Sequence, residues 1–544
     1  MIAEAQPMQA KQEAARLGSS ERTVIVWALG LASLAIYYFA LTLPYSLIKY
    51  YATPLLDLAK INHHTYESGW NLIGAFIALF LIYGVVWLLM PRVLQVGRGL
   101  ALAIILLPAA FILALTFVYP VGAADIFDYI MHARLLPVYH ANPFTILPVQ
   151  FKDDPFLQYI AWPYTTSAYG PLWELIAAAI GWLGGDSLWA NLLYFKALAI
   201  ISYFANALLI YFIVRRYNPA WLWRAMVFYL WNPLVLFEIA TNGHNDLLMM
   251  TGVLAAIAAL DWQRETLRYA GASAFLILGT LVKFLAAPFL PLLWIEASKL
   301  RGQSRQRRTV IIVVSVGVAL LLAAAFYLPF FEPGKDILSA ARRADMFTAS
   351  VPNAVKISLE DSGFSAEMAA TIARSIAIGL LGLFYIWQMW RLWRGRTTLV
   401  RAGFEVLFFY LLVSILWFQP WYLMWIVALA PLIPDWGVQV RTYAFCVTAM
   451  ANYVVWDMLF FWVYHDINEV EWGSLYFVYP LPLLLSVGFI VYNWWQGRRA
   501  CYPSPQPSPE MGEGEQPPPQ PSPEMEEGEQ FPPQPAPASA EAQP

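Results

Sequence analysis

The sequence predicts an all-α, polytopic integral membrane protein with about twelve crossings and a few short re-entrant or broken helices. Hydrophobic residues make up 60% of the 544 residues and charged residues only 13%, whereas a soluble domain carries roughly 25% charged residues. Many apolar runs, such as residues 23–43 and 99–120, are long enough to cross a bilayer, which takes about 20 residues in a helix. A membrane β-barrel would show alternating segments of about 10 residues instead.

The apolar runs are interpreted as helices in chain order. They lie at residues 23–44, 70–90, 99–119, 169–185, 190–214, 225–240, 246–260, 270–297, 309–331, 369–390, 403–418, 421–434, 442–463 and 473–496. A polar segment, residues 1–21, precedes the first run. No small-residue cleavage site stands behind that run, so we expect an uncleaved helix rather than a signal peptide.

Both ends of the sequence differ in composition from the apolar body, residues 22–499. Residues 500–544 are rich in Pro and Glu, and residues 505–518 recur almost unchanged as residues 519–532. Such sequence cannot bury a core, so we expect a disordered cytoplasmic tail. The two cysteines, Cys446 and Cys501, lie in an apolar run and in the tail, which predicts no disulfide framework.

The positions of the basic residues predict the orientation of the helices. Short loops rich in Lys and Arg face the cytoplasm, and these are Arg92 and Arg98, Arg215, Arg216 and Arg224, Arg264 and Arg268, residues 299–308, residues 391–401, and Arg498 and Arg499. A strict alternation of crossings from one side of the membrane to the other does not fit the basic loops at two places. The short run 169–185 must enter the membrane without crossing it, and run 270–297 must be two half-length helices that meet near Lys283, as broken helices do where they line a cavity.

With these two corrections, the outer face collects all six histidines. The outer loops lie near residues 45–69, 120–168 and 332–368, with shorter segments at 241–246, 418–421 and 464–472. None of them contains an Asn-x-Ser/Thr glycosylation acceptor, which favours a bacterial cytoplasmic membrane over a glycosylating lumen. We therefore expect the titratable chemistry on the extracytoplasmic side.

The stretch VGAADIFDYIMHAR, residues 121–134, follows directly on an apolar run. If it is helical, Asp125, Asp128, Tyr129 and His132 share one face at positions i, i+3, i+4 and i+7. One interpretation is an interfacial helix with its polar side in water and Asp125 near its positive N-terminal end. Another is an acid–base site, because a half-buried carboxylate is a good proton acceptor. A third is a site for a divalent metal, Mg²⁺ or Mn²⁺.

Five further elements follow in order along the chain. They are Asn142-Pro143-Phe144, Tyr169-Gly170-Pro171-Leu172, Gly243-His244-Asn245-Asp246, Lys283 in an apolar stretch, and Pro420-Trp421-Tyr422. With Asp125 and Tyr129, this series resembles the GT-C superfamily of membrane glycosyltransferases, and within it the bacterial polyprenol-phosphate-mannose-dependent α-mannosyltransferases. The resemblance covers roughly residues 100–435.

The resemblance implies an enzyme that moves a hexose, mannose above all, from a polyprenyl-phosphate donor to a glycan or glycolipid hydroxyl at the surface of the lipid bilayer. Asp125 would be the general base of an inverting transfer, with Asp128 as its partner. The leaving phosphate would need positive groups rather than an acid. No cofactor is implied with certainty, no metal ligand is assigned, and no nucleic acid is expected. The expected substrate-binding residues are Tyr129, His132, Asn142, Tyr169, Asn242, His244, Asn245, Asp246, Lys283, Arg342, Arg343, Gln419, Trp421 and Tyr422.

Each of these assignments has a structural alternative. Lys283 could contact the donor phosphate or pair with a buried acid such as Glu238, since a charge in the membrane is costly. The residues of 241–248 could bind sugar hydroxyls or act as helix caps. Arg342 and Arg343 could hold phosphate or lipid headgroups, and Trp421 and Tyr422 could stack on sugar or mark the interface.

A transporter or flippase for a polar or lipid-linked substrate is the rival function, because broken helices and an intramembrane Lys suit either class. A transporter would place polar groups near the midplane and carry inverted repeats. The membrane body shows no internal repeat, and its acids gather on one face.

Overall fold

The computed structural model describes residues 18–335 and 346–501. Every regular element among them is helical, and the only β pairings in this part of the chain are two isolated bridges, Ser46 with Val118 and Thr348 with Trp417. This confirms the predicted all-α class. Contacts divide the chain into a unit of residues 1–490 and a unit of residues 491–544. The description below concerns the first unit. The proposed boundaries at residues 21 and 500 stay predictions, and most of the predicted tail lies outside the described residues.

Eight helical segments are long and apolar enough to cross a membrane. They are α2 with η1 (Ser19–Thr42), α5 (Tyr66–Leu89), α6 (Arg98–Thr116), α9 (Leu188–Tyr217), α15 with η7 (Arg305–Phe330), α17 (Ala366–Trp393), α20 with η12 (Trp436–Tyr464), and α21 (Ile467–Val478) with the first part of α22 (Pro480–Cys501). The polytopic character follows from these segments. The number of twelve crossings stays a prediction.

Shorter helices fill the remainder of the first unit. They are α3 (Leu47–Tyr50), α4 (Leu58–Ile61), α7 (Asp125–Leu135), α8 (Pro171–Gly184), α10 (Leu222–Leu230), α11 (Pro233–Leu236), η5 (Phe237–Asn242), α12 (Asp246–Ala259), α13 (Glu265–Val282), α14 (Phe289–Ser298), α16 (Val351–Asp361), α18 (Leu399–Phe409), η9 (Tyr410–Ser414), η10 (Pro420–Tyr422) and α19 (Leu423–Leu429), with single 3₁₀ turns η2 (Pro148–Gln150), η3 (Leu157–Tyr159), η4 (Pro219–Trp221), η6 (Phe284–Ala286) and η11 (Ala430–Leu432).

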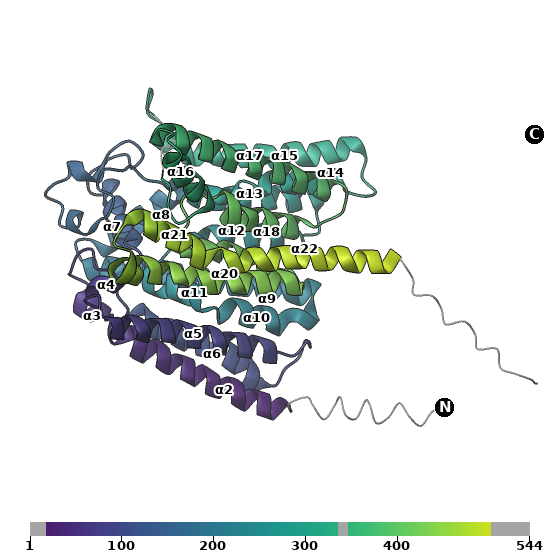
Figure 1. The fold of residues 1–544 in the computed structure, drawn as a ribbon. Helices are drawn as coiled ribbons and strands as arrows, with labels where there is room; N and C mark the ends of the chain where they lie inside the picture. Colours follow the sequence, from purple (N-terminus) through teal and green to yellow (C-terminus); the bar gives the residue numbers. More distant parts are fainter. Residues whose placement is uncertain (1–17, 336–345, 502–544) are drawn as a thin grey trace, which may run out of the picture. The chain divides into compact units, whose positions relative to one another are not determined.

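The predicted outer loops meet at one end of the long helices, where α3, α4, α7 and α16 are found in Figure 1. The Tyr159 hydroxyl donates to the carbonyl of Ala52 at 3.2 Å, which joins loop 120–168 to loop 45–69. The Trp462 indole donates to the carbonyl of His64 at 2.9 Å, and the bridge from Thr348 to Trp417 joins two further outer segments.

The predicted cytoplasmic loops also contact one another. The Trp223 indole donates to the carbonyl of Leu94 at 2.9 Å, Arg216 pairs with Asp261 at 3.3 Å, and Lys299 donates to the carbonyl of Leu392 at 2.8 Å. The basic loops of the first unit that the sequence assigned to one side therefore do gather at one end of it, whereas Arg498 and Arg499 belong to the second unit.

The two predicted exceptions to alternation are present. Helix α8 has 14 residues, about 21 Å at 1.5 Å per residue. Both of its ends touch the outer loop: Tyr169, just before it, donates to Tyr129, and Arg134 pairs with Asp186 just after it. The apolar run 270–297 breaks at Lys283, whose extended backbone (φ −150°, ψ 129°) ends α13. The two parts are not both half-length as predicted, because α13 has 18 residues, about 27 Å, whereas α14 has 10.

Candidate active site

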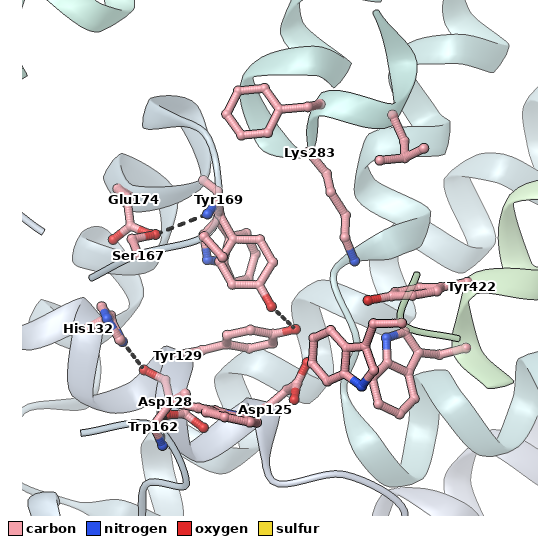
Figure 2. Close-up of a pocket in the computed structure, with 16 residues that line it drawn as sticks. Asp125, Asp128, Tyr129, His132, Trp162, Ser167, Tyr169, Glu174, Lys283 and Tyr422 are labelled. Carbon is pink, nitrogen blue, oxygen red and sulfur yellow. Dashed lines mark hydrogen bonds between the residues drawn. The ribbon is translucent and has the colours of Figure 1, made fainter. Parts of the chain in front are cut away.

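Helix α7 presents the four predicted residues to a single cavity. Asp125, Asp128, Tyr129 and His132 all line a pocket of about 210 Å³, in keeping with their helical spacing. The predicted Tyr169, Lys283, Trp421 and Tyr422 line the same pocket from three other elements (Figure 2). Residues up to about 300 positions apart in the sequence thus converge on one site.

The two aspartates of α7 differ in their surroundings. The Asp128 carboxylate accepts the backbone N–H groups of Trp162 at 3.1 Å and of Ala161 at 3.4 Å, and the residue is only 8% exposed. The Asp125 side chain is 20% exposed, and no hydrogen-bond donor among the described residues bonds to it. Asp128 therefore holds the loop that carries Trp162, while Asp125 remains available to a ligand.

Aromatic hydroxyls form the wall beside Asp125. The Tyr169 hydroxyl donates to the Tyr129 hydroxyl at 3.3 Å, and the two rings meet edge to face at 5.4 Å. Burial raises the pKa of Tyr129 well above its usual value, and the neighbouring Tyr169 and Asp125 add to the shift. Tyr129 is therefore a neutral phenol that can donate a hydrogen bond at physiological pH.

Lys283 extends into the cavity from the break between α13 and α14 (Figure 2). Its ammonium lies 2.7 Å from the carboxylate of Asp246, which also accepts the Trp425 indole N–H at 2.6 Å. The rings of Tyr422, Trp425 and Tyr169 surround the ammonium at 5.1, 5.7 and 5.8 Å. The expected alternative of an ion pair is present, but its partner is Asp246 rather than Glu238, because α12 packs antiparallel to α13 and brings its first residue to the break.

Gly170 explains why the break and the Tyr-Gly-Pro-Leu element lie together. Its N–H donates to the carbonyl of Val282 at 3.1 Å. A Cβ at this position would stand 2.2 Å from the carbonyl oxygen of Leu281, so only glycine permits this approach. Pro171 then starts α8 at its first position, where a missing N–H costs nothing.

The comparisons with known proteins can now be set beside this geometry. Residues 26–299, half of the chain, match the family model described as alpha-(1->6)-mannopyranosyltransferase, N-terminal domain. The protein belongs to this family.

A curated relative in this alpha-(1->6)-mannopyranosyltransferase family is Alpha-(1->6)-mannopyranosyltransferase A of Mycobacterium tuberculosis (strain ATCC 25618 / H37Rv). The two are 24% identical over 285 residues, which is 50% of this chain and 52% of the relative. The match thus spans about half the length of that relative.

In this member of the mannopyranosyltransferase family, the predicted segment 241–246 lies behind the cavity rather than in its lining. Asn242, His244, Asn245 and Asp246 are at most 3% exposed. Gly243 joins η5 to α12 with a left-handed backbone (φ 72°), which favours glycine. A direct contact of these four side chains with sugar stays a prediction.

His244 lies between two carboxylates in this buried layer. Its Nδ1 is 3.9 Å from Asp125, its Nε2 is 3.4 Å from Glu238, and its ring stacks on Trp421 at 4.3 Å. Glu238 itself accepts hydrogen bonds from Asn242 and Tyr453, each at 2.7 Å. The layer therefore gives Asp125 a fixed imidazole neighbour.

The remaining predicted residues lie away from the first cavity. Asn142 donates to the carbonyl of Phe330 at 2.9 Å and to Glu332 at 2.7 Å, and so connects two outer loops. Gln419 lines a second cavity instead. Arg342 and Arg343 lie outside the described residues.

The acidic face of α7 does not assemble a metal-binding cluster in the described part of this family member. No group of three or more His, Cys, Asp or Glu among these residues is placed to hold a metal ion. The reason is local: the Asp128 carboxylate faces two backbone N–H groups, and Nδ1 of His132 donates to the Asp128 carbonyl at 2.9 Å.

Sequence reasoning missed several residues of the cavity. Glu174 lines it and accepts a hydrogen bond from Ser167 at 2.5 Å, although an acid inside the apolar helix α8 is the kind of residue expected to be functional. Trp162 and Trp417 also line it. Nothing in their local sequence separates them from the protein's 24 tryptophans.

Proposed function

We propose that this protein is a membrane α-mannosyltransferase that moves a mannosyl group from a polyprenyl-phosphate donor to a hydroxyl of a glycan or glycolipid, with inversion. The proposal rests above all on Asp125 and Lys283. A carboxylate that accepts no hydrogen bond from the described residues and a largely buried ammonium come from distant segments and line one cavity. Family membership and the name of the mycobacterial relative support the mannosyl group.

Asp125 is the general base in this proposal. The acceptor oxygen forms a bond to the anomeric carbon, its proton passes to Asp125, and the bond from that carbon to the phosphate oxygen breaks with its electrons going to the phosphate. Asp125 suits this role better than Asp128, whose oxygens already accept two N–H groups. Because the Asp125 carboxylate is partly exposed, it can contact an acceptor hydroxyl that enters the cavity from the aqueous side.

Lys283 would stabilise the phosphate as negative charge collects on it. An ammonium has three N–H donors, and Asp246 takes one of them at 2.7 Å. The others are left for phosphate oxygens at the mouth of the cavity. Tyr129, Tyr169 and Tyr422 add hydroxyl groups around the same space, so the leaving group is stabilised without an acid.

His244 is a positioning residue in this proposal. It stands within 3.9 Å of Asp125 and within 3.4 Å of Glu238, and an imidazole in that place holds the carboxylate toward the cavity.

The site would face the extracytoplasmic side of a bacterial cytoplasmic membrane. The support is the gathering of Arg- and Lys-rich loops at the opposite end of the first unit, since such loops stay in the cytoplasm. A polyprenyl donor would then reach the cavity from the bilayer and the acceptor from outside.

The proposal is tested with the purified full-length protein, a polyprenyl-phosphate mannose donor and an α-(1→6)-linked mannan oligosaccharide. Transfer should occur without a nucleotide sugar and should give an α linkage, as read from the product by NMR. Transfer from GDP-mannose but not from the lipid donor, or transport of the lipid without transfer, would contradict it.

A further inference from the structure

A second cavity adjoins the candidate active site at the outer end of the first unit. It measures about 490 Å³ and shares two of its lining residues, Trp162 and Trp417, with the first cavity. The two indoles meet nearly at right angles with ring centres 6.1 Å apart. The cavity is also lined by Gly122, three residues before Asp125. The tryptophan pair is thus a wall with a cavity on each side.

Three polar side chains converge on this second cavity and remain without partners. Gln419, Asn452 and Asp457 line it, and none of their side chains forms a hydrogen bond or a salt bridge with another described residue. Asn452 is only 4% exposed, and its Oδ1 is buried without a hydrogen-bond donor. A buried polar atom nearly always has a partner, so the Oδ1 of Asn452, with the half-exposed Gln419 and Asp457 beside it, indicates a polar ligand.

The chemistry of the lining favours a carbohydrate. Trp162, Trp417 and Trp456 present three indoles, and an indole ring offers a flat apolar face to the C–H groups of a pyranose. Two amides and a carboxyl group supply both donors and acceptors for hydroxyl groups. No Lys, Arg or His is among the described residues that line this cavity, whereas the first cavity holds Lys283. A phosphate therefore fits the first cavity better, and an uncharged glycan the second.

We propose that the second cavity is the acceptor subsite and binds a mannose-containing oligosaccharide chain. This inference rests on the proposed function and adds the position at which the acceptor binds. The non-reacting sugars would lie against Trp456, Asn452 and Asp457, and the terminal sugar would pass the Trp162–Trp417 wall to bring its hydroxyl to Asp125. Asp128 holds this wall by accepting the Trp162 N–H at 3.1 Å, which gives the second aspartate of α7 a role in acceptor alignment.

Equilibrium binding in the absence of donor tests the proposal directly. The purified full chain is titrated with α-(1→6)-linked mannotetraose and followed by NMR. Asp457→Asn keeps the shape of the side chain and replaces its carboxyl group with an amide, and Gln419→Ala and Trp456→Leu remove two other contacts. Loss of a hydrogen bond or of an indole contact should raise the dissociation constant for mannotetraose by about threefold to tenfold. The KM for the lipid donor should stay within about twofold of its original value.

Trp393→Leu is the matched control, since Trp393 is 57% exposed at the opposite, basic end of the first unit. It should leave the affinity for mannotetraose unchanged, and thermal unfolding should show that all variants fold.

Three results would overturn the assignment. They are unchanged affinity in all three variants, a larger effect on the donor than on mannotetraose, or no binding of mannotetraose by the original protein. Binding of mannotetraose in the absence of donor does not need Asp125. A wrong assignment of the base would therefore appear in the turnover of Asp125→Asn, whereas a wrong assignment of this subsite would appear in the binding experiment.

Discussion

Replacing Asp125 with Asn should change the catalytic rate without changing the stability of the fold. The Asp125 carboxylate is 20% exposed and accepts no hydrogen bond from a described residue, and His244 is 3.9 Å away. Asn has nearly the same shape, so it breaks no hydrogen bond and should leave the thermal stability unchanged. The loss should appear in turnover alone.

The expected loss follows from the role of a general base. Positioned proton transfer is worth about 10²–10⁴-fold in rate, or about 3–5 kcal/mol of activation free energy at 1.36 kcal/mol per tenfold. Asp125→Asn should therefore lower kcat by about that factor and leave the KM for the lipid donor nearly unchanged.

Asp128→Asn is the matched comparison, because it changes a neighbouring carboxylate that already has partners. An Asn amide at this position presents an NH₂ group to one of the two backbone N–H groups of Ala161 and Trp162. A buried donor left without an acceptor costs about 1–3 kcal/mol. Asp128→Asn should thus lower the stability and weaken acceptor binding, with a smaller effect on kcat.

The assay measures initial rates with the polyprenyl-phosphate mannose donor, at saturating acceptor, beside thermal unfolding of each variant in the same detergent. Turnover of Asp125→Asn within a few-fold of the original enzyme would refute the base assignment. A similar fall in kcat for both variants without any change in stability would also refute the distinction drawn between the two aspartates.

Three further perturbations follow from the same structure. Lys283→Met leaves Asp246 buried without its cation, so it should cost about 3–5 kcal/mol of stability. The double variant Lys283→Met/Asp246→Asn should regain stability but still show a raised KM for the donor. Recovery of that KM in the double variant would mean that Lys283 has only a structural role. In a cysteine-free background, Tyr164→Cys, at a position 74% exposed, should react with an impermeant maleimide in intact cells, and Trp393→Cys, at a position 57% exposed, should react only after lysis; the reverse pattern would invert the topology. EDTA should leave transfer intact if the Asp128 carboxylate keeps its two backbone N–H partners and binds no metal, and restoration of lost activity by Mg²⁺ or Mn²⁺ would show that a metal takes part.

The sequence by itself was enough to predict the helical membrane class, the two breaks in alternation and the helical face of α7. These features depend on local periodicity and on the cost of placing charge in lipid, and both act over a few turns of helix. The short helix α8 was predicted because two apolar runs had to make one net crossing between the outer loop and Arg215. The break near Lys283 was predicted because run 270–297 has a basic loop on each side. The face of Asp125, Asp128, Tyr129 and His132 followed from 3.6 residues per turn alone.

Only the tertiary structure decided which partner each polar group found. Lys283 meets Asp246 rather than Glu238 because the antiparallel packing of α12 and α13 sets the level at which their ends meet. His244 is buried between Asp125 and Glu238, and Gln419 lines the second cavity rather than the first, although the sequence listed both simply as substrate-binding residues. A motif fixes the type of a side chain, but its direction depends on contacts between helices hundreds of residues apart, and no local pattern carries that information.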